Sequence, residues 1–293
     1  MEYGRSIKIF LSDGSPTGLR HIEIANWSGQ AIACPRSRFN DLQKWEEAKR
    51  PGVYLLFEKH STDDKNTVYI GESENVYNRI CNHDKNKDFW NEVIIFTSKD
   101  ENLTKSHIKY LESRLTIITK EIDRYNLENS NTPTQSILPR ADVAAMEEYI
   151  GNCKLLLGTL GHKLLEPINS VVSNSDNNIQ ENTILGRLFY LSVNGITASG
   201  KLTDEGFVLL KDSQISKTST NSIPNNIKLF RERLISENIL QEKQKYFLLI
   251  KDIIISSSSF AAAFVVGTSR SGPQSWKDKN GKTMKYIEEL LLK

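Results

Sequence analysis

Five side chains in the first half of the chain have the types and the order that hydrolysis of a phosphodiester would need. The reaction requires an activated water, a cation facing the charge that develops on the phosphate, and help for the leaving oxygen. Arginine can grip a phosphate through two parallel hydrogen bonds, which lysine cannot match. Tyrosine and histidine can accept or relay a proton. The five residues are Tyr54, Tyr69, Arg79, His83 and Glu112.

Glu112 has the strongest argument of its own. Apolar residues that include Ile108 and Leu115 recur at helical spacing, and Glu112 lies between these two on the face that should turn inward. An unpaired carboxylate in an apolar setting is unfavourable by several kcal/mol. A bound divalent cation would remove that cost, and oxygen ligands favour magnesium. The alternative is a pairing of Glu112 with Lys109 or Arg114 at the helix edge.

Two predicted strands place the tyrosines. The runs 52–57 and 67–71 have the composition of strands, and the polar loop between them predicts a hairpin. Each strand carries a glycine close to its tyrosine, and a strand that ends in glycine lets a substrate backbone approach. Gly71 is therefore expected to contact the substrate.

Predicted helices carry the other members of the set. A short helix over 73–83 puts Arg79 and His83 on one face, because they are four residues apart. A longer helix over 103–122 carries Glu112. Further elements are expected as strands at 7–11, 21–24 and 92–97 and as helices at 35–50 and 142–157.

The order and spacing of these residues resemble the GIY-YIG nuclease family. Gly52-Val53-Tyr54 and Tyr69-Ile70-Gly71 look like its two motifs, with valine in place of isoleucine in the first. In that family an arginine follows the second motif, a histidine or similar residue comes one helical turn later, and a glutamate on a later helix holds a single divalent metal ion. The residues that match these places are Arg79, His83 and Glu112.

The resemblance implies an α+β fold, with a GIY-YIG core of a small three-stranded antiparallel sheet flanked by helices and a smaller α+β C-terminal domain. It also implies hydrolysis with one Mg²⁺ or Mn²⁺ ion per active site, held by Glu112. Tyr54 is favoured to accept the proton of the attacking water, and Arg79 would neutralise charge in the transition state. Tyr69 could share the proton transfer and His83 could act as the relay instead, so the division of labour stays open.

Four more residues are expected to contact the substrate. The family usually has an asparagine after the glutamate helix, and Asn129 or Asn131 could match it. Lys105 lies near the start of that helix, and Lys277 lies in a basic loop beside a tryptophan, as in a patch that contacts phosphates and stacks on bases. Solvated lysines and a buried tryptophan are the commoner alternatives.

Length and composition indicate two domains. The chain of 293 residues exceeds the roughly 100–150 residues usual for one domain. Residues 166–183 are rich in Asn and Ser, which is typical of a linker. The expected parts are a β-rich extension with a helix at 1–50, the GIY-YIG nuclease domain at 51–165, that linker, and a C-terminal domain at 184–293.

The charge distribution bears on the partner. The overall net charge is only +2, but residues 224–293 carry twelve Lys/Arg against seven Asp/Glu. Such an excess suits a polyanion and is also common on solvated surfaces. Together with the resemblance it favours DNA, with RNA as the weaker alternative, and a C-terminal domain that binds nucleic acid or another partner. A homo-oligomer stays open.

Cysteine usage and hydropathy bear on the compartment. Cys34, Cys81 and Cys153 lie far apart without a C-x-x-C pair, which favours a reducing compartment and no structural zinc. The first residues contain no apolar run of signal-peptide length, and no apolar run reaches the ~20 residues of a membrane span. We expect a cytoplasmic protein without membrane contact, and no role for His60 or His162.

The resemblance extends beyond the core. Asn26-Trp27-Ser28-Gly29 and the segment 256–267 are similar to a bacterial subgroup that joins a GIY-YIG core to a small C-terminal domain of unknown function. The sequence thus predicts a metal-dependent DNA endonuclease that serves restriction, phage defence or repair. The competing hypothesis is a non-catalytic nucleic-acid-binding or complex-assembly protein that keeps the nuclease fold.

Overall fold

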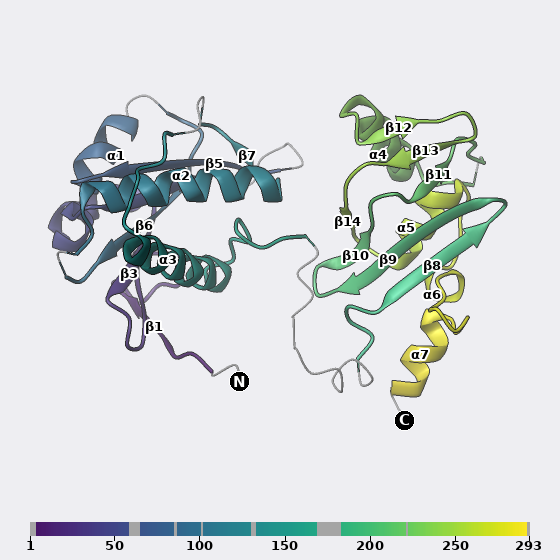
Figure 1. The fold of residues 1–293 in the computed structure, drawn as a ribbon, viewed down its shortest axis with the longest axis horizontal. Coiled ribbons are helices and arrows are strands. Elements are labelled where there is room, and N and C mark those ends of the chain that lie inside the picture. The colour runs from purple at the N-terminus through teal and green to yellow at the C-terminus, as the bar shows by residue number, and fades with distance from the viewer. Residues whose placement is uncertain are drawn as a thin grey trace. The chain divides into compact units, whose positions relative to one another are not determined.

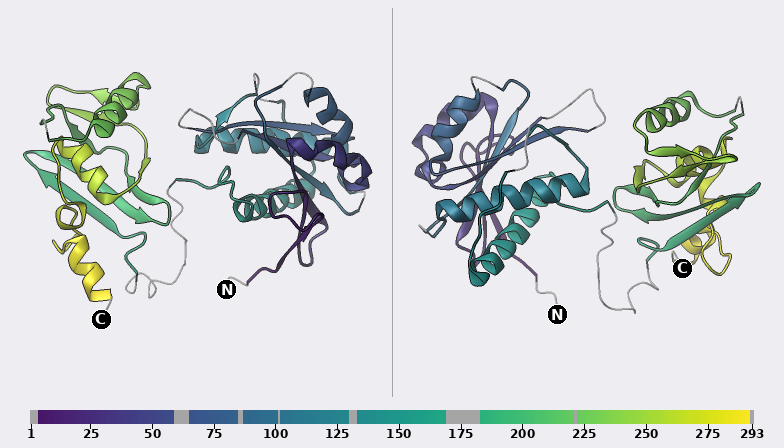
Figure 2. Two further views of the ribbon diagram at one scale, coloured as in Figure 1. Left: turned by 180° about the vertical axis from the view of Figure 1, so that it is seen from behind. Right: turned by 45° about the horizontal axis from the view of Figure 1, so that its top comes forward.

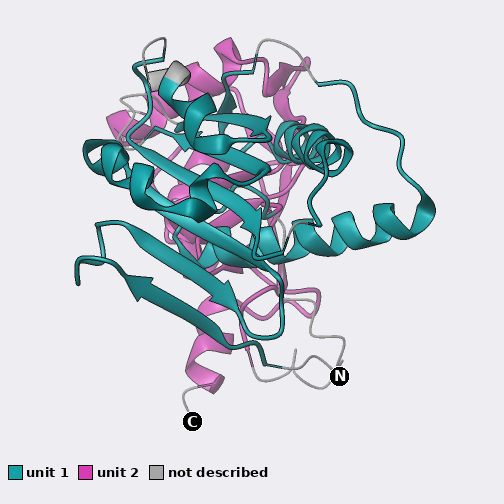
Figure 3. Cartoon of the chain, turned by 90° about the vertical axis from the view of Figure 1, so that its left-hand side faces the viewer, with its two compact units in different colours: residues 1–166 teal, residues 167–293 magenta. Residues whose placement is uncertain are grey.

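The chain is α+β and divides into two compact units, 1–166 and 167–293, which Figure 3 colours separately. Each unit is described by itself. The predicted linker at 166–183 falls almost wholly outside the described residues. The computed structural model describes residues 4–58, 65–84, 87–100, 102–129, 133–168, 183–220 and 222–291.

Unit 1 (Figure 1) is built on a sheet whose described strands number seven, in the order β1-β2-β3-β6-β4-β5-β7. Neighbouring strands are antiparallel except β5 and β7, which are parallel. The strands span Ile7–Leu11 (β1), Arg20–Ile24 (β2), Gly29–Pro35 (β3), Gly52–Phe57 (β4), Thr67–Ser73 (β5), Glu92–Ser98 (β6) and Asn126–Leu127 (β7).

The expected three-stranded sheet, β6-β4-β5, is the middle of this larger sheet. The predicted sheet was too small because the prediction missed β3. This strand pairs with β6, from Gly29 opposite Ser98 to Pro35 opposite Glu92. Through β3, the β1-β2 hairpin joins the same sheet. The segment before residue 51 is therefore continuous with the sheet that carries the tyrosines.

β4 is buried along its whole length, because strands flank it on both sides and helices cover both of its faces. The alternation of a strand sends its side chains to two separate cores. Val53 and Leu55 belong to the core on the face of α2 (Lys105–Ile122) and α3 (Arg140–Thr159), two helices that lie against each other in Figure 2. Tyr54 belongs to the opposite core, beneath α1 (Val76–Asp84).

The helix expected at 35–50 is instead two 3₁₀ helices, η1 (Arg36–Lys44) and η2 (Glu46–Lys49). They meet at Trp45, whose backbone is extended, with φ −102° and ψ 107°. Phe39, Leu42 and Ala48 are the buried residues of this stretch, at intervals that are multiples of three. That spacing fits the three residues per turn of a 3₁₀ helix better than the 3.6 of an α-helix.

Unit 2 contains a four-stranded sheet, β14-β10-β9-β8, and a three-stranded sheet, β11-β13-β12, among its described residues. Its elements are β8 (Leu188–Val193), β9 (Ile196–Thr203), β10 (Gly206–Leu209), β11 (Gln214–Ser216), α4 (Asn225–Ser236), β12 (Leu240–Glu242), β13 (Tyr246–Leu249), β14 (Ile253–Ile255), α5 (Ser258–Val266), α6 (Gly272–Ser275) and α7 (Met284–Leu291).

The core of unit 2 surrounds α5, which is apolar on nearly all sides, as a fully buried helix must be. Trp276 is completely buried in this core, 4.6 Å from Phe207 between ring centroids, and its indole N–H donates to the carbonyl of Ser258 at 2.9 Å. The tryptophan is thus a core residue, which was the commoner of the two alternatives.

Two further findings concern the cysteines and the length and polarity of the helices. The three cysteines are free thiols. Among the described residues, no helix has both the length and the apolar character needed to cross a bilayer.

Candidate active site

The structure brings Tyr54, Tyr69, Arg79 and Glu112 into one cluster in unit 1. The rings of Tyr54 and Tyr69 lie 6.1 Å apart between centroids, on the neighbouring strands β4 and β5. Arg79 from α1 acts electrostatically on both phenols and on the carboxylate of Glu112 from α2. His83 lies in α1, as predicted, but its side chain is outside the described part of the structure.

Local sequence fixes the position of Arg79. The side chain of Asn75 accepts a hydrogen bond from the backbone N–H of Asn78 at 3.0 Å and so caps the first turn of α1. Ser73, the last residue of β5, donates its hydroxyl to the Asn75 carbonyl at 2.9 Å. Strand and helix are therefore joined by a tight turn, and Arg79 follows one helical turn later, within reach of both tyrosines.

Gly71 makes room for a tyrosine. It pairs directly with Tyr54 across β4 and β5, and a Cβ at this position would lie 2.4 Å from the Tyr54 Oη. At Gly52 a Cβ would lie 2.3 Å from the carbonyl oxygen of Phe96. The space that Gly71 leaves is filled by the ring of Tyr54, so the expected contact with a substrate backbone has no room there.

The two tyrosines differ in accessibility. Tyr54 is fully buried, whereas Tyr69 is half-buried. Burial raises the pKa of both phenols above the ordinary value, and the charge of Glu112 adds to the rise at Tyr69. Arg79 opposes the rise in the pKa of each. Both phenols are therefore protonated at neutral pH unless a further positive charge approaches them.

Tyr69 has a cation on its ring face that the sequence did not single out. The Lys87 Nζ lies 4.6 Å from the ring centroid and 3.6 Å from a carboxylate oxygen of Glu128. A lysine over an aromatic face is attracted by the ring quadrupole. Lys87 thus adds positive charge beside the more accessible tyrosine.

Glu112 stands on the side of α2 that meets β5. Burial, and then the charge of Glu72, raise the pKa of the Glu112 carboxyl to about 7, against the opposing charges of Arg79 and Lys105. The carboxylate also accepts a hydrogen bond from the backbone N–H of Glu72. The alternative pairing with Arg114 is wrong, because Arg114 Nε donates to Glu147 at 2.7 Å.

The start of α2 is held by a capping box. The side chain of Thr104 accepts from the N–H of His107, and the His107 ring accepts from the N–H of Thr104. His107 therefore caps the helix that carries Glu112.

Asn129 completes the open edge of β5. Its side-chain oxygen accepts from the Ile70 N–H at 3.0 Å, and its side-chain nitrogen donates to the Ile70 carbonyl at 2.7 Å. These two bonds imitate a neighbouring strand beyond the short β7. Asn129 therefore holds the strand that carries Tyr69, with both ends of its amide occupied by backbone. Asn131, the other asparagine considered, lies outside the described residues.

Lys105 belongs to an ion cluster at the same edge. Its Nζ lies 2.9 and 3.1 Å from the two carboxylate oxygens of Glu72 and 3.8 Å from Glu74. Sequence reasoning missed Glu72, although its place directly after the second tyrosine motif and the alternation of β5 could have put it on the α2 face. Lys277, by contrast, belongs to unit 2, where its backbone pairs with Tyr190 at 2.7 and 2.9 Å.

The donor set of the cluster suits a single magnesium ion. Magnesium keeps several waters and is usually bound by one or two carboxylates together with substrate phosphates. Glu112 and Glu72 supply such carboxylates, and a divalent cation would relieve the repulsion that raises the Glu112 pKa. Across the described ranges there is no group of three or more His, Cys, Asp or Glu that could hold a metal by itself.

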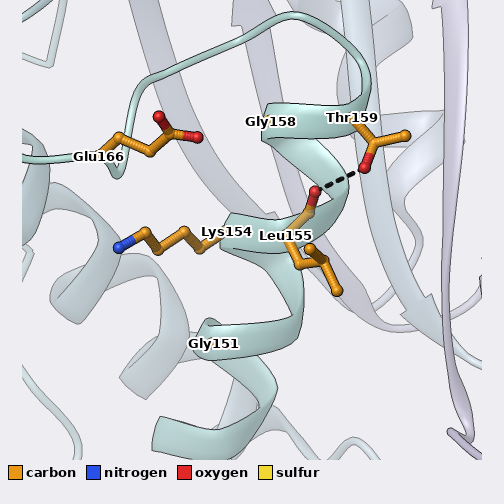
Figure 4. A pocket seen from close by; sticks show the side chains of 6 residues that line it. All are labelled: Gly151, Lys154, Leu155, Gly158, Thr159 and Glu166. Carbon is orange, nitrogen blue, oxygen red and sulfur yellow. Dashed lines mark hydrogen bonds between the residues drawn. The ribbon is translucent and has the colours of Figure 1, made fainter. Parts of the chain in front are cut away.

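A separate open pocket lies along α3 (Figure 4). Its lining offers one lysine and one carboxylate, while the hydroxyl of Thr159 is committed to the Leu155 carbonyl at 2.9 Å. It contains none of the residues predicted to act on a phosphodiester, and we assign no chemistry to it. It is lined by Gly151, Lys154, Leu155, Gly158, Thr159 and Glu166.

Comparison with known proteins gives one match. Residues 189–288, within unit 2, match the model of a family described as Domain of unknown function (DUF4357). No curated protein and no solved structure matches the chain. The predicted small C-terminal domain of unknown function is thus found in unit 2. No match to the GIY-YIG family is found, so the comparisons do not support that resemblance in unit 1.

Proposed function

We propose that unit 1 is an endonuclease of the GIY-YIG type that hydrolyses phosphodiester bonds in DNA with a divalent cation. The observation that carries the proposal is the convergence of Tyr54, Tyr69, Arg79 and Glu112 from two strands and two helices. Titratable groups with shifted pKa values gather at functional sites, because catalysis needs charges in places where stability alone would not put them. Glu112 is such a group.

Arg79 is the phosphate-binding residue of this proposal. It is exposed at the surface, so a substrate can reach it, while its inner side contacts the two tyrosines. A guanidinium can hold two phosphate oxygens at once and neutralise charge in the transition state. Tyr54 and Tyr69 would then hold it in the orientation needed.

The accessibility of the tyrosines favours a different division of roles from the one the sequence favoured. The sequence favoured Tyr54 as the group that accepts the proton of the attacking water, but Tyr54 is fully buried. Tyr69 is half-buried and has Arg79 and Lys87 beside it. We therefore assign the orientation of the water and the proton transfer to Tyr69. Tyr54 would hold the Arg79 side chain in position.

Glu112 would hold the divalent cation. When bound, the ion would stabilise negative charge on the phosphate and on the leaving oxygen. In the balanced reaction, a water oxygen bonds to phosphorus as the bond to the leaving sugar oxygen breaks. The water gives up one proton, and the leaving oxygen takes one up.

DNA as the substrate is supported by the resemblance and by the basic excess of residues 224–293. A basic surface attracts the phosphate backbone whatever its sequence. The C-terminal unit is then the part that binds nucleic acid or a partner, and restriction, phage defence or repair is the biological setting we propose.

The test is cleavage of plasmid DNA by the purified full chain with Mg²⁺ or Mn²⁺. We expect nicking or cutting that falls about 100-fold or more in Glu112→Gln and Arg79→Ala, the size of loss seen when one transition-state contact is removed. Glu121→Gln is the matched control, since Glu121 is exposed near the other end of α2. It should cleave like the wild type.

Full cleavage by both site variants would overturn the assigned site. Binding without cleavage across single- and double-stranded DNA and RNA would favour the alternative, a non-catalytic protein that keeps the nuclease fold. Cleavage of RNA but not of the matched DNA strand would make the enzyme RNA-directed.

A further inference from the structure

We propose that Glu72 is a second carboxylate of the cation site and that Lys105 is an internal cation that competes for it. The inference rests on the proposed function, because it concerns the same site. It assigns to Glu72 and Lys105 roles that neither the motif nor the family match provides.

Glu72 is placed to share a cation with Glu112. It lies on β5 directly after Gly71, with its side chain toward the α2 face and only 14% exposed. Its backbone N–H donates to the Glu112 carboxylate. The hydrogen bond holds that carboxylate at the strand residue that carries the second one, and a divalent cation would stabilise two carboxylates placed in this way.

Lys105 occupies an unusual place for a lysine. It is the first residue of α2, after the N-cap Thr104, and positive charge at a helix N-terminus opposes the helix dipole. Its Nζ nevertheless reaches across to both oxygens of Glu72, at 2.9 and 3.1 Å. This one ammonium thus binds both oxygens of the Glu72 carboxylate.

A divalent cation at Glu72 must take the place that this ammonium holds. Without the ion, Lys105 limits the repulsion between the carboxylates and fixes the Glu72 rotamer. With the ion, the Lys105 side chain, already 42% exposed, would turn out to solvent. Lys105 therefore lowers the affinity for the cation while it keeps the empty site folded. The opposite assumption, that Lys105 mainly contacts a substrate phosphate, predicts no effect on cation affinity.

The test measures Mn²⁺ binding to the full chain by isothermal titration calorimetry, without nucleic acid. We expect Glu72→Gln to weaken binding by about 10-fold or more, the usual effect of altering a group that supports a metal site. Lys105→Met should tighten it by about 10-fold, or 1.4 kcal/mol. In the double variant the gain from Lys105→Met should disappear, because the carboxylate for which it competes is gone.

Lys65→Met is the matched control. Lys65 Nζ pairs with Asp123 at 2.7 Å, and its side chain is 32% exposed, similar to Lys105. It should leave Mn²⁺ affinity unchanged. If Glu72→Gln does not fold, as judged by circular dichroism, Lys105→Met alone decides between tightening and no change.

Two outcomes would overturn the inference and leave the proposed function intact. One is unchanged Mn²⁺ affinity in Glu72→Gln while Glu112→Gln binds weakly. The other is unchanged Mn²⁺ affinity in Lys105→Met with weaker DNA binding, which would make Lys105 a phosphate contact. Absence of Glu112-dependent Mn²⁺ binding in the wild type would instead remove the cation from the proposed function itself.

Discussion

At the scale of one residue, Glu112 differs in charge and burial from the core residues beside it on α2. Its neighbours on α2, among them Leu111 and Leu115, are buried and apolar, and Lys109 is exposed. Glu112 lies between these environments, and burial holds its carboxyl pKa at about 7. A charge kept there reduces stability, so a use beyond folding is the simplest physical reason for it.

The free energy of unfolding should depend on pH because the Glu112 carboxyl is partly buried. Because the folded-state pKa is raised above the ordinary 4.5, Glu112 supports the fold below about pH 4.5, and that support is lost as pH rises to about 7. The shift corresponds to at most about 3 kcal/mol, and screening of a partly exposed group reduces this to about 1–2 kcal/mol. Glu112→Gln should therefore gain stability over the wild type between pH 5 and pH 8.

Urea unfolding at the two pH values, with chelator present, measures this gain. Glu121→Gln, on the same helix but exposed, serves as the control and should show no such trend. An equal difference between Glu112→Gln and the wild type at pH 5 and pH 8 would contradict the burial of the charge.

Gly71 and Gly151 form a contrasting pair of glycines. Gly71→Ala places a methyl group 2.4 Å from the Tyr54 Oη, whereas nothing lies within 4 Å of a Cβ at Gly151. We expect Gly71→Ala to destabilise the protein by about 1–3 kcal/mol through overpacking and to impair cleavage by displacing Tyr54. Gly151→Ala, within α3, should stabilise it by about 0.5–1 kcal/mol. Thermal unfolding compares them, and an equal effect of both would refute the packing of Tyr54 on Gly71.

At the scale of elements, the edge of β5 explains why the site lies where it does. Among the described residues, β7 pairs with Thr67 and Val68, and no described strand pairs with the later part of β5 on that side. The Asn129 side chain hydrogen-bonds to the backbone N–H and carbonyl of Ile70, and the Glu112 carboxylate accepts from the N–H of Glu72. Side chains thus close an edge that would otherwise invite pairing with another chain. The strand that carries Tyr69 is held in place by polar groups.

Removing the Asn129 amide should loosen this edge. Asn129→Ala leaves the N–H and carbonyl of Ile70 without their partner, which is unfavourable by about 1–3 kcal/mol when the groups are shielded from water. Cleavage should fall as well, because β5 positions Tyr69. Asn126→Ala is the control, since that side chain makes a single 3.4 Å contact with the Lys65 carbonyl. Chemical denaturation and the cleavage assay together test this, and equal behaviour of the two variants would speak against the bracing role.

At the scale of the whole molecule, each unit carries its own core and should unfold separately. Unit 1 contains a buried ion cluster in which Glu92 accepts from Arg20 and lies 2.9 Å from the ring of His162. His162 also stacks on Phe57, with 3.8 Å between ring centroids. The cluster ties the segment after α3 back to the sheet. His162, for which no role was predicted, is thus a structural residue; His60 lies outside the described residues.

Calorimetry of the full chain should resolve this separation. Glu92→Gln removes the buried charge that pairs with Arg20, and breaking one side of a buried ion pair is unfavourable by about 3–5 kcal/mol. The unfolding transition of unit 1 should shift down while that of unit 2 stays in place. Trp276→Ala, in the core of unit 2, should do the reverse. A single transition that shifts with either variant would contradict independent cores.

The sequence by itself determined where the elements that carry the proposed site begin and end. β4, β5, β6, α1 and α2 occur where they were predicted, and α2 begins within two residues of the expected start. These elements follow from patterns within a few residues, such as the alternation of a strand or the turn of a helix. The joint spacing of Tyr54, Tyr69, Arg79 and Glu112 could therefore be recognised before any contact between them was known.

Only the tertiary structure decided how these residues are buried and which partners they have. That Tyr54 is fully buried and Tyr69 half-buried, that Asn129 binds a strand, and that β3 enlarges the sheet depend on contacts between distant segments. Lys105 meets Glu72 across 33 residues of chain, and His162 meets Glu92 across 70. Local periodicity carries no information about such partners, because burial and charge pairing are properties of the packed chain. The proposed cation site, with its competing lysine, likewise depends on contacts between distant segments.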